Sequence, residues 1–465
     1  MSSLVNTLPT LLLTASPEAS EASASNGSAI LVAVLLSLMV IYLASKVGGE
    51  LCSRINLPPV LGELLGGVVV GVSALHLLVF PESGLGAENS LLMQAVQAAL
   101  GLTPDAVQET FAAQSEVISV LAELGVIILL FEIGLESDLS ELIRVGPQAA
   151  IVAVVGVTVP FVAGTLGLLT LFHVPTVPAI FAGAALTATS IGITAKVLSE
   201  IRQLSSSEGQ IIIGAAVLDD VLGIIILAVV SSLAKTGEVE VGSVVYLIGG
   251  AGVFLVGSIV VGRLVSPLFM GLVKGMQTRG NLLIASLVVM LALAFVGAAI
   301  QLEAILGAFT AGLILAETDR AKELEEQVLP LADFLVPIFF VCVGAKTDLS
   351  VLNPAVPANR EGLVIAGFLI VVAILGKVTS GFAVWGGATK INQLAIGVGM
   401  VPRGEVGLVF AAAGSDSGVL PPALDVAIVV MVIITTFVAP PLLRLVFPKG
   451  DPTAVAAAVP EPPAP

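Results

Sequence analysis

Charged residues, basic residues and cysteine are all scarce in this chain. Only 11% of its 465 residues are Asp, Glu, Lys or Arg, less than half the share usual in soluble domains, which argues against a soluble protein. The two cysteines, Cys52 and Cys342, fall near or inside different apolar segments and indicate neither a disulfide framework nor a metal site. With a net charge of −16, the chain also lacks the basic face that nucleic-acid binding needs.

Apolar residues and glycine take the place of the missing charge. Hydrophobic residues make up 57% of the chain, the mean hydropathy is +1.10 and there are 48 glycines, as expected where helices pack closely in lipid. A membrane-spanning helix needs about 20 apolar residues. The sequence therefore predicts an all-α polytopic membrane protein with about 13 transmembrane helices, at residues 29–45, 57–80, 117–136, 147–172, 176–199, 209–233, 243–267, 280–300, 302–318, 328–347, 362–386, 393–415 and 422–447.

The loops and tails predict how the chain is oriented. Every second loop, starting with the loop after the first span, belongs to one set. This set and the C-terminal end together carry 13 Lys and Arg residues, whereas the other loops carry only three. Cytoplasmic loops are enriched in these residues, so the N-terminus is expected outside and the C-terminus in the cytoplasm. Residues 1–28, rich in Ser, Ala and Glu, are expected to be a disordered outer tail, and residues 448–465, rich in Pro and Ala, a disordered cytoplasmic tail.

Two adjacent acids lie in the middle of one apolar segment. Asp219 and Asp220 fall inside residues 211–233, which are otherwise apolar. A charge at this depth costs several kcal/mol unless it is neutralised, paired or hydrated, so ion or proton handling is the first hypothesis. The alternative is a buried structural pair. Neighbours on a helix point about 100° apart, so the two carboxyls can hold different partners.

Two other segments are poor continuous helices. Residues 186–194 combine hydroxyl side chains with Gly192, and residues 397–407 combine several glycines with Pro402, which removes a helix hydrogen bond. Unpaired backbone at membrane depth is tolerated only where it lines a cavity or is covered by protein. Alternatively, Gly and Pro mark simple kinks.

The two interrupted segments also predict an internal repeat. They lie seven spans apart, so they cross the membrane in opposite directions, and each precedes a span with a mid-chain acid, Asp219-Asp220 in one case and Asp425 in the other. Paired interrupted helices are typical of transporter binding sites in inverted repeats. We therefore predict inverted repeats at 29–233 and 280–447, joined by a linker span at 243–267, within one transmembrane domain at 29–447.

Several motifs together resemble one known family. Residues 187–194 (TATSIGIT) and 214–221 (GAAVLDDV) look like those of monovalent cation:proton antiporters of the Kef and NapA type. Residues 57–63 (LPPVLGE), 121–125 (LAELG), 307–312 (GAFTAG) and 400–407 (MVPRGEVG) fit the same family. The resemblance covers about residues 29–447. It implies a NapA-like fold with two crossing discontinuous helices, and a homodimer.

The resemblance also implies roles for three charged residues. It implies that Asp220 binds the transported Na⁺ and that Asp219 pairs with a lysine of the eleventh span, which here is Lys377. Lys377 is too central in its apolar stretch to reach the interface easily, so it needs an acidic partner or must lose its proton. Two interpretations stay open: a permanent structural pair, or a pair whose proton takes part in transport.

Polar residues at the two interruptions complete the candidate site. Thr189 and Ser190 would offer hydroxyl or backbone oxygens to a dehydrated cation, which prefers oxygen ligands; alternatively, each hydroxyl bonds to its own backbone. Arg403 and Glu405 are expected to neutralise each other and the exposed helix ends, a structural role.

The predicted function is electrogenic sodium:proton antiport by alternating access, in which an ion-binding half moves against a dimerisation half. The expected partners are a monovalent cation, the proton, the bilayer and a second copy of the chain, without a cofactor or enzymatic activity. The expected location is a bacterial plasma membrane, or a thylakoid membrane if the chain is cyanobacterial, which its length and acidic outer tail suggest. The alternative is a potassium:proton antiporter or a Kef-type potassium efflux protein. An intramembrane aspartyl protease is disfavoured, because its two carboxyls must share one site.

Overall fold

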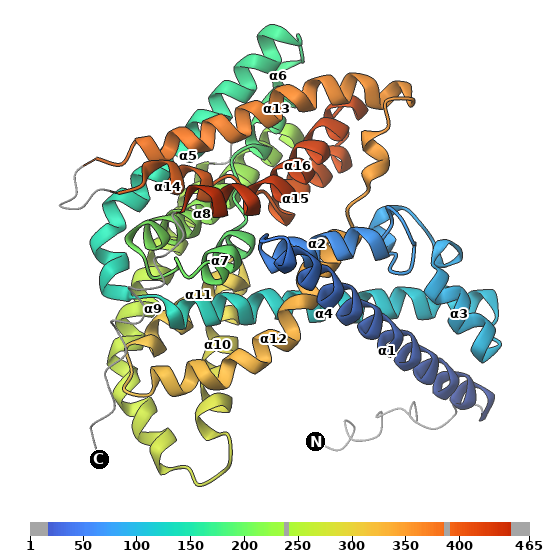
Figure 1. Ribbon diagram of the computed structural model, residues 1–465, viewed down its shortest axis with the longest axis horizontal. Helices are drawn as coiled ribbons and strands as arrows, with labels where there is room; N and C mark the ends of the chain where they lie inside the picture. Colours follow the sequence, from blue (N-terminus) through green and yellow to red (C-terminus); the bar gives the residue numbers. More distant parts are fainter. Residues whose placement is uncertain (1–16, 237–240, 386–390, 448–465) are drawn as a thin grey trace, which may run out of the picture.

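The structure of the protein is a computed structural model that describes residues 17–236, 241–385 and 391–447 (Figure 1). Within these ranges every regular element is a helix. Nine of the described helices are long and apolar enough to cross a membrane. The other predicted spans correspond to two shorter helices and to two segments that break in the middle. The all-α polytopic class predicted from the sequence is therefore confirmed.

The helices form two bundles (Figure 1). The first bundle consists of α1 (Pro17–Arg54), α2 (Pro59–Val70), α4 (Pro104–Glu136), α10 (Asn281–Ala299), α11 (Ala304–Ala316) and α12 (Ala321–Ala345). The second bundle consists of α5 (Leu139–Leu171), α6 (Thr176–Ala185), α7 (Ile191–Glu200), α8 (Ser207–Thr236), α13 (Pro357–Phe382), α14 (Gln393–Gly399), α15 (Glu405–Asp416) and α16 (Pro422–Val446). In Figure 1, α13 and α6 of the second bundle lie along the top, and α10 and α12 of the first bundle lie toward the bottom.

Each half of the chain contributes to both bundles. The first bundle contains α1, α2 and α4 of the N-terminal half and α10 to α12 of the C-terminal half. The second bundle contains α5 to α8 of the N-terminal half and α13 to α16 of the C-terminal half. The long helix α9 (Val241–Gly275) joins the two halves and contacts α8, α10 and α11. The short helix α3 (Leu91–Leu100) packs beside α1 and α4.

Apolar side chains form two separate buried clusters. The smaller cluster lies within the second bundle and contains Leu168, Phe181, Leu369, Phe410 and Met431, from five different helices. The larger cluster runs through the first bundle and extends to buried residues of α7, α8 and α14. The second bundle thus has a core of its own, while its inner helices also rest on the first bundle.

The helix boundaries differ from the predicted ones in two places. The helix α1 begins at Pro17, so residues 17–28, expected to belong to a disordered tail, are helical and extend the spanning helix. The rest of that tail, residues 1–16, and the tail at 448–465 lie outside the described residues. The second span ends at Val70 rather than at residue 80, because the chain turns at Gly71, directly against Ala345.

Glycine allows two helices of the first bundle to touch through their backbones. A Cβ atom at Gly134 of α4 would lie 2.4 Å from the carbonyl oxygen of Phe309 in α11, and 3.0 Å from the Cα of Gly312. No side chain fits at such a separation. Because lipid offers no hydrophobic drive for helix association, this close van der Waals contact is what holds the pair together.

We expect Gly134→Ala to destabilise the protein by about 1–3 kcal/mol, since the extra methyl group forces α4 and α11 apart. Thermal unfolding in detergent measures the effect. Gly146→Ala in α5 is the matched control: nothing lies within 4 Å of its added Cβ, so its midpoint should stay level or rise slightly. Equal midpoints for the two variants would show that the α4–α11 contact is not tight.

Candidate functional site

Two spans of the second bundle are interrupted by extended segments. The first interruption comprises residues 186–190, between α6 and α7, and the second comprises residues 400–404, between α14 and α15. Both lie within the ranges that the sequence predicted, and both are shorter than predicted, because α7 already begins at Ile191 and α15 at Glu405.

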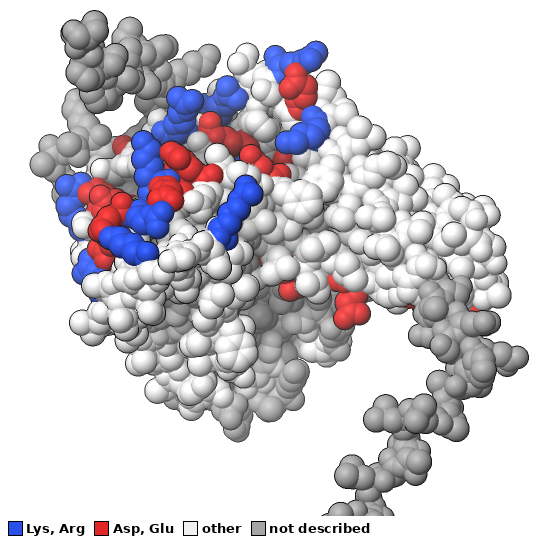
Figure 2. Space-filling view, turned by 90° about the horizontal axis from the view of Figure 1, so that it is seen from below, with Lys and Arg blue, Asp and Glu red and all other residues white. Residues whose placement is uncertain are grey.

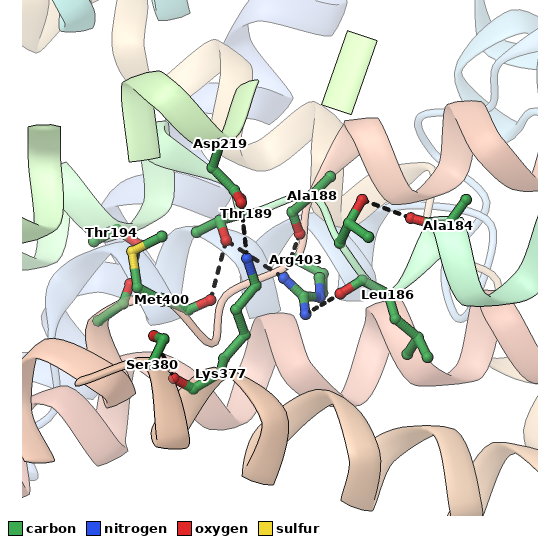
Figure 3. A network of polar contacts seen from close by, with 12 residues as sticks. Ala184, Leu186, Ala188, Thr189, Thr194, Asp219, Lys377, Ser380, Met400 and Arg403 are labelled. Carbon is green, nitrogen blue, oxygen red and sulfur yellow. Dashed lines mark hydrogen bonds and ion pairs between the residues drawn. The ribbon is translucent and has the colours of Figure 1, made fainter. Parts of the chain in front are cut away.

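The two interruptions cross and satisfy each other's backbone (Figure 3). The backbone N–H of Ser190 donates to the carbonyl of Pro402 at 2.9 Å. The Thr189 hydroxyl donates to the carbonyl of Met400 at 3.1 Å, and the Thr194 hydroxyl to that of Gly399 at 3.0 Å. Backbone groups that would be costly to leave unpaired in a membrane therefore find partners in the opposite segment. The expectation of two crossing discontinuous helices is confirmed.

Arg403 ties the second interruption to the end of α6. Its fully buried guanidinium donates to the carbonyls of Leu186 and Ala188 and, at 3.4 Å, to the Thr189 hydroxyl. Its own carbonyl accepts from the hydroxyl of Thr436 in α16. A cation at the C-terminal end of a helix offsets the partial negative charge of the free carbonyls there. This contact fits the structural role expected of Arg403.

The predicted pairing of Arg403 with Glu405 stays a prediction. The backbone of Glu405 begins α15, but its side chain lies outside the described residues.

Asp219 and Lys377 form a buried ion pair between α8 and α13. The Lys377 Nζ lies 3.0 Å from each carboxylate oxygen of Asp219, and both side chains are fully buried. Figure 3 shows Lys377 rising from α13 toward Asp219, beside the crossing. The structure thus brings together the two residues that the family resemblance implied as partners. Removing one member of such a pair typically costs about 3–5 kcal/mol, because the other charge is left alone.

Small residues make room for the lysine. A Cβ atom at Gly156 of α5 would lie 3.5 Å from both the Cδ and the Nζ of Lys377, so a longer side chain there would displace the ammonium group. The Ser380 hydroxyl donates to the carbonyl of Lys377, one turn earlier in α13. Sequence reasoning missed Gly156, Ser380 and Thr436, since nothing in the sequence relates them to the two acids.

Asp220 and Ser190 differ from their neighbours Asp219 and Thr189 in their surroundings. Asp220 is buried but keeps 9% of its surface exposed, whereas Asp219 has none. The Ser190 Oγ is buried and has no hydrogen-bond partner among the described residues. Gly404 passes close to it, since a Cβ there would lie 2.7 Å from that oxygen. The Thr189 hydroxyl is already engaged with Met400 and Arg403, so the two hydroxyls that the sequence grouped together differ in availability.

Asp425 corrects the expected symmetry of the two halves. It is not in the middle of its span but in the first turn of α16, which begins at Pro422, and it interacts there with Ser415. The predicted span of 422–447 starts at the same residue as α16, so the span start was predicted correctly and only the description of Asp425 as a mid-chain acid was wrong. The two crossing segments are therefore similar in the two halves, but the acids are not.

Comparisons with known proteins agree on one family. The family described as "Sodium/hydrogen exchanger, transmembrane" matches residues 34–449. The chain is 69% identical over 418 residues to the high-affinity Na⁺/H⁺ antiporter NhaS3 of Synechocystis sp., covering 90% of each chain. It is 31% identical over 417 residues to the Na⁺/H⁺-K⁺ antiporter GerN of Bacillus cereus, covering 89% of this chain and 96% of the relative.

A solved structure shares the fold. The sodium proton antiporter MjNhaP1 from Methanocaldococcus jannaschii superimposes with a TM-score of 0.59, covering 91% of this chain and 100% of that one, at 16% sequence identity. An identity this low speaks for the fold alone. The helical fold of this chain is thus one that a known antiporter also adopts.

The Asp219–Lys377 pair generates a test by stability. We expect Asp219→Asn to lower the free energy of unfolding by about 3–5 kcal/mol, because Lys377 keeps a buried charge without a partner. Combining it with Lys377→Gln should recover part of this loss, since no charge is then left alone. Thermal unfolding of the two single variants and the double variant gives the coupling energy. Strictly additive losses would contradict the pair.

Proposed function

Because this chain belongs to the sodium/hydrogen exchanger family, we propose that it exchanges Na⁺ for H⁺ across a membrane by alternating access, with Asp220 as the carboxylate for which the two ions compete. It is a transporter and not an enzyme. The position of Asp220 carries its assignment. It directly follows Asp219, which is buried in the ion pair with Lys377, and of these two adjacent acids only Asp220 keeps exposed surface.

Competition for one carboxylate couples the two fluxes. A carboxylate that has released its proton can hold Na⁺, and one that has taken a proton cannot. An uncompensated carboxylate is costly to carry through a low-dielectric environment, so the site moves only in its protonated or its sodium-bound form. Exchange follows because each crossing needs one of the two ions.

Oxygen atoms around the crossing complete the sodium site in this proposal. Na⁺ is a hard cation that prefers oxygen ligands, like Ca²⁺ and Mg²⁺. Asp220 supplies the charge and the Ser190 Oγ a neutral oxygen that has no other described partner. Thr189 contributes through its backbone or through the hydroxyl that already binds Met400. These ligands come from α8 and the first interruption, so they move together.

The second bundle is the moving part, and the first bundle is the support. Few elements cross the boundary between them, mainly α7, which contacts α2 and α4. A cavity of about 440 Å³ lies at the boundary between the bundles, lined by Glu123 and Phe339 of the first bundle and Leu408 of the second. A second cavity of about 380 Å³ includes Glu136 and Ser199. Sliding of α7 between these cavities would expose the site to either side in turn.

Apolar packing against α7 borders the first cavity, which Val126 and Phe339 line. Gly192, near the start of α7, faces Val126 and Leu129 of α4 and Phe339 of α12. At the other end of α7, the Glu200 carboxylate accepts from the backbone N–H of Val60, 3.2 Å away at the start of α2. In our proposal these contacts close the ion site to one side of the membrane, and they break when the second bundle moves.

Lys377 makes the exchange electrogenic in this proposal. Asp219, Asp220, Lys377 and Arg403 sum to zero when all are ionised. If Lys377 releases its proton as Na⁺ binds and regains it on the return, the proton-bearing form carries one more positive charge than the sodium-bearing form. Two protons then cross for each sodium ion. The contrasting interpretation keeps the pair ionised throughout and moves one proton.

We further propose the assembly and placement of the protein. The chain forms a homodimer through the first bundle, whose α1 presents Leu31, Leu35, Met39 and Leu43 on one exposed face. It lies in a bacterial plasma or thylakoid membrane, with the N-terminus outside and the C-terminus in the cytoplasm, as the distribution of Lys and Arg predicts. The repeats at 29–233 and 280–447, with the linker span at 243–267, fit the equal contribution of both halves to each bundle.

Ion selectivity is tested by proton efflux from vesicles that contain the protein, titrated with Na⁺, Li⁺ and K⁺. We expect Na⁺ to drive efflux at the lowest concentration. Potassium is the alternative substrate because the relative GerN is named for K⁺ as well. Half-maximal efflux at equal or lower K⁺ concentration would favour that alternative.

We expect Asp220→Asn to abolish exchange while the protein stays folded, because an amide keeps the size of the side chain but binds neither a proton nor a cation by charge. Sodium-driven proton movement in vesicles measures the loss, and thermal unfolding checks the fold. Asp425→Asn is the control: it removes a carboxyl of the same bundle that lies in the first turn of α16, and should leave exchange intact. Exchange near the unmodified rate in Asp220→Asn would refute the assignment.

Voltage dependence tests the role of Lys377. At a fixed pH difference, the sodium gradient at which proton flux reverses should shift about tenfold for each 60 mV of membrane potential, because one net charge crosses per cycle. Vesicles clamped at two potentials give the shift. In Lys377→Gln, any residual exchange should reverse at the same gradient at both potentials. A voltage-independent reversal point in the unmodified protein would make the exchanger electroneutral.

A further inference from the structure

An apolar groove runs beside the contact of the linker helix α9 with α10 and α11 of the first bundle. Its volume is about 460 Å³, and it is lined by Gly257, Val261 and Phe269 of α9, Val289 and Val296 of α10 and Ile314 of α11, among others, nearly all of them apolar. Its residues in α9 run from Val253 to Phe269, about 24 Å along the helix axis. The hydrocarbon of one membrane leaflet is about 15 Å thick, so an acyl chain that follows the groove spans its leaflet.

One end of this groove opens into a charged cavity. The cavity has a volume of about 420 Å³ and shares Ser266 and Ile314 with the groove. Its charged residues are Arg263 and Lys274 of α9, and Glu317 and Asp319, which follow α11. Figure 2 shows basic and acidic side chains gathered at one end of the molecule, while most of the remaining surface in that view carries no charge. An apolar channel with charges at one end is the shape of a lipid, tail and head group.

The ion pairs of the charged cavity leave its cations able to change partners. Lys274 and Asp319 lie 3.2 Å apart, with 56% and 81% of their side chains exposed. Exposed pairs of this kind stabilise a protein by about 1 kcal/mol or less. A lipid phosphate can therefore replace Asp319 at Lys274, and Arg263, held by Glu317 in a two-bonded pair, adds positive charge beside it. Basic residues between helices at the cytoplasmic surface are suited to phosphate head groups.

Two glycines leave the space open. A Cβ atom at Gly257, in the groove, or at Gly271, in the charged cavity, would meet no atom within 4 Å. Neither residue is needed for close helix packing, unlike Gly262, whose Cβ would lie 2.4 Å from Ile314. At these two positions α9 therefore adds no side chain to the space beside α10 and α11.

We propose that this groove binds one phosphate-bearing glycerolipid, with an acyl chain between α9 and the α10–α11 pair and the phosphate at Lys274 and Arg263. The lipid fills the space between the linker helix and the first bundle. It therefore fastens the segment that joins the two halves of the chain to the supporting bundle, independently of which cation the protein carries.

The test uses the full chain, purified in detergent and stripped of lipid. Phosphatidylglycerol should raise its unfolding midpoint, and monogalactosyl diacylglycerol with the same acyl chains should raise it much less. Lys274→Gln should weaken the apparent affinity for phosphatidylglycerol about tenfold, as expected for the loss of one charge-assisted contact. Equal responses to the two lipids would overturn the role of the phosphate, and no response to either would overturn the site.

Gly257→Leu tests the groove itself, because it adds a side chain to a lining position where a Cβ atom would meet no atom within 4 Å. The unfolding midpoint of this variant should no longer rise when phosphatidylglycerol is added. Gly252→Leu is the matched control, on the same helix and also open at its Cβ, but not part of the groove; it should respond like the unmodified protein. A normal response in Gly257→Leu would overturn the proposal.

A photoreactive phosphatidylglycerol provides a measurement on the unmodified chain, should Gly257→Leu fail to fold. Mass spectrometry should find its acyl chain cross-linked to peptides of α9, α10 or α11. Cross-links confined to other helices, or a groove covered by a second copy of the chain, would contradict the proposed occupant.

Discussion

The need to pair every backbone group at membrane depth governs this structure. Two spans stop being helical in their middle, and each leaves carbonyls and N–H groups that lipid cannot satisfy. The extended segments cross, so that Ser190 binds Pro402 and Thr189 binds Met400. Arg403 donates hydrogen bonds to the carbonyls of Leu186 and Ala188, just after the end of α6. The crossing would be costly without these contacts, and it places irregular backbone next to the Asp219–Lys377 pair of α8 and α13.

Charge balance follows from that crossing. Asp219 and Lys377 are both fully buried, and neither would be tolerated alone at this depth. Arg403, also fully buried, adds a second cation to the neighbourhood. Asp220 follows Asp219 directly in α8 and keeps a little exposed surface, whereas Asp219 keeps none. The arrangement suits a carboxylate that must exchange one small cation for another.

Close packing within each bundle suits movement of one bundle against the other. The first bundle has backbone contacts such as that of Gly134 with Phe309, and the second has contacts such as that of Gly397 with Val378. The second bundle has an apolar cluster of its own and meets the first mainly through α7. A rigid support and a self-contained moving part are what a rigid-body transport cycle requires.

The sequence by itself determined the membrane class, the approximate spans, the two interruptions and the acids of α8. Those features are local: apolar length, glycine and proline within a span, and a charge that lipid penalises can all be read along the chain. It located the end of the second span poorly, at residue 80 rather than at Val70, because apolar residues continue through the turn. The pairing of Asp219 with Lys377 came from a family resemblance rather than from spacing.

Only the tertiary structure decided which atoms meet. The sequence treated Thr189 and Ser190 alike, yet one hydroxyl is engaged by Met400 and the other is left without a described partner. It had no signal for Gly156 beside Lys377 or for Thr436 beneath Arg403. Such contacts join residues more than 30 positions apart, and they depend on helix rotation and on separations of a fraction of an ångström. Local pattern carries neither quantity, because both are set by how all the helices pack at once.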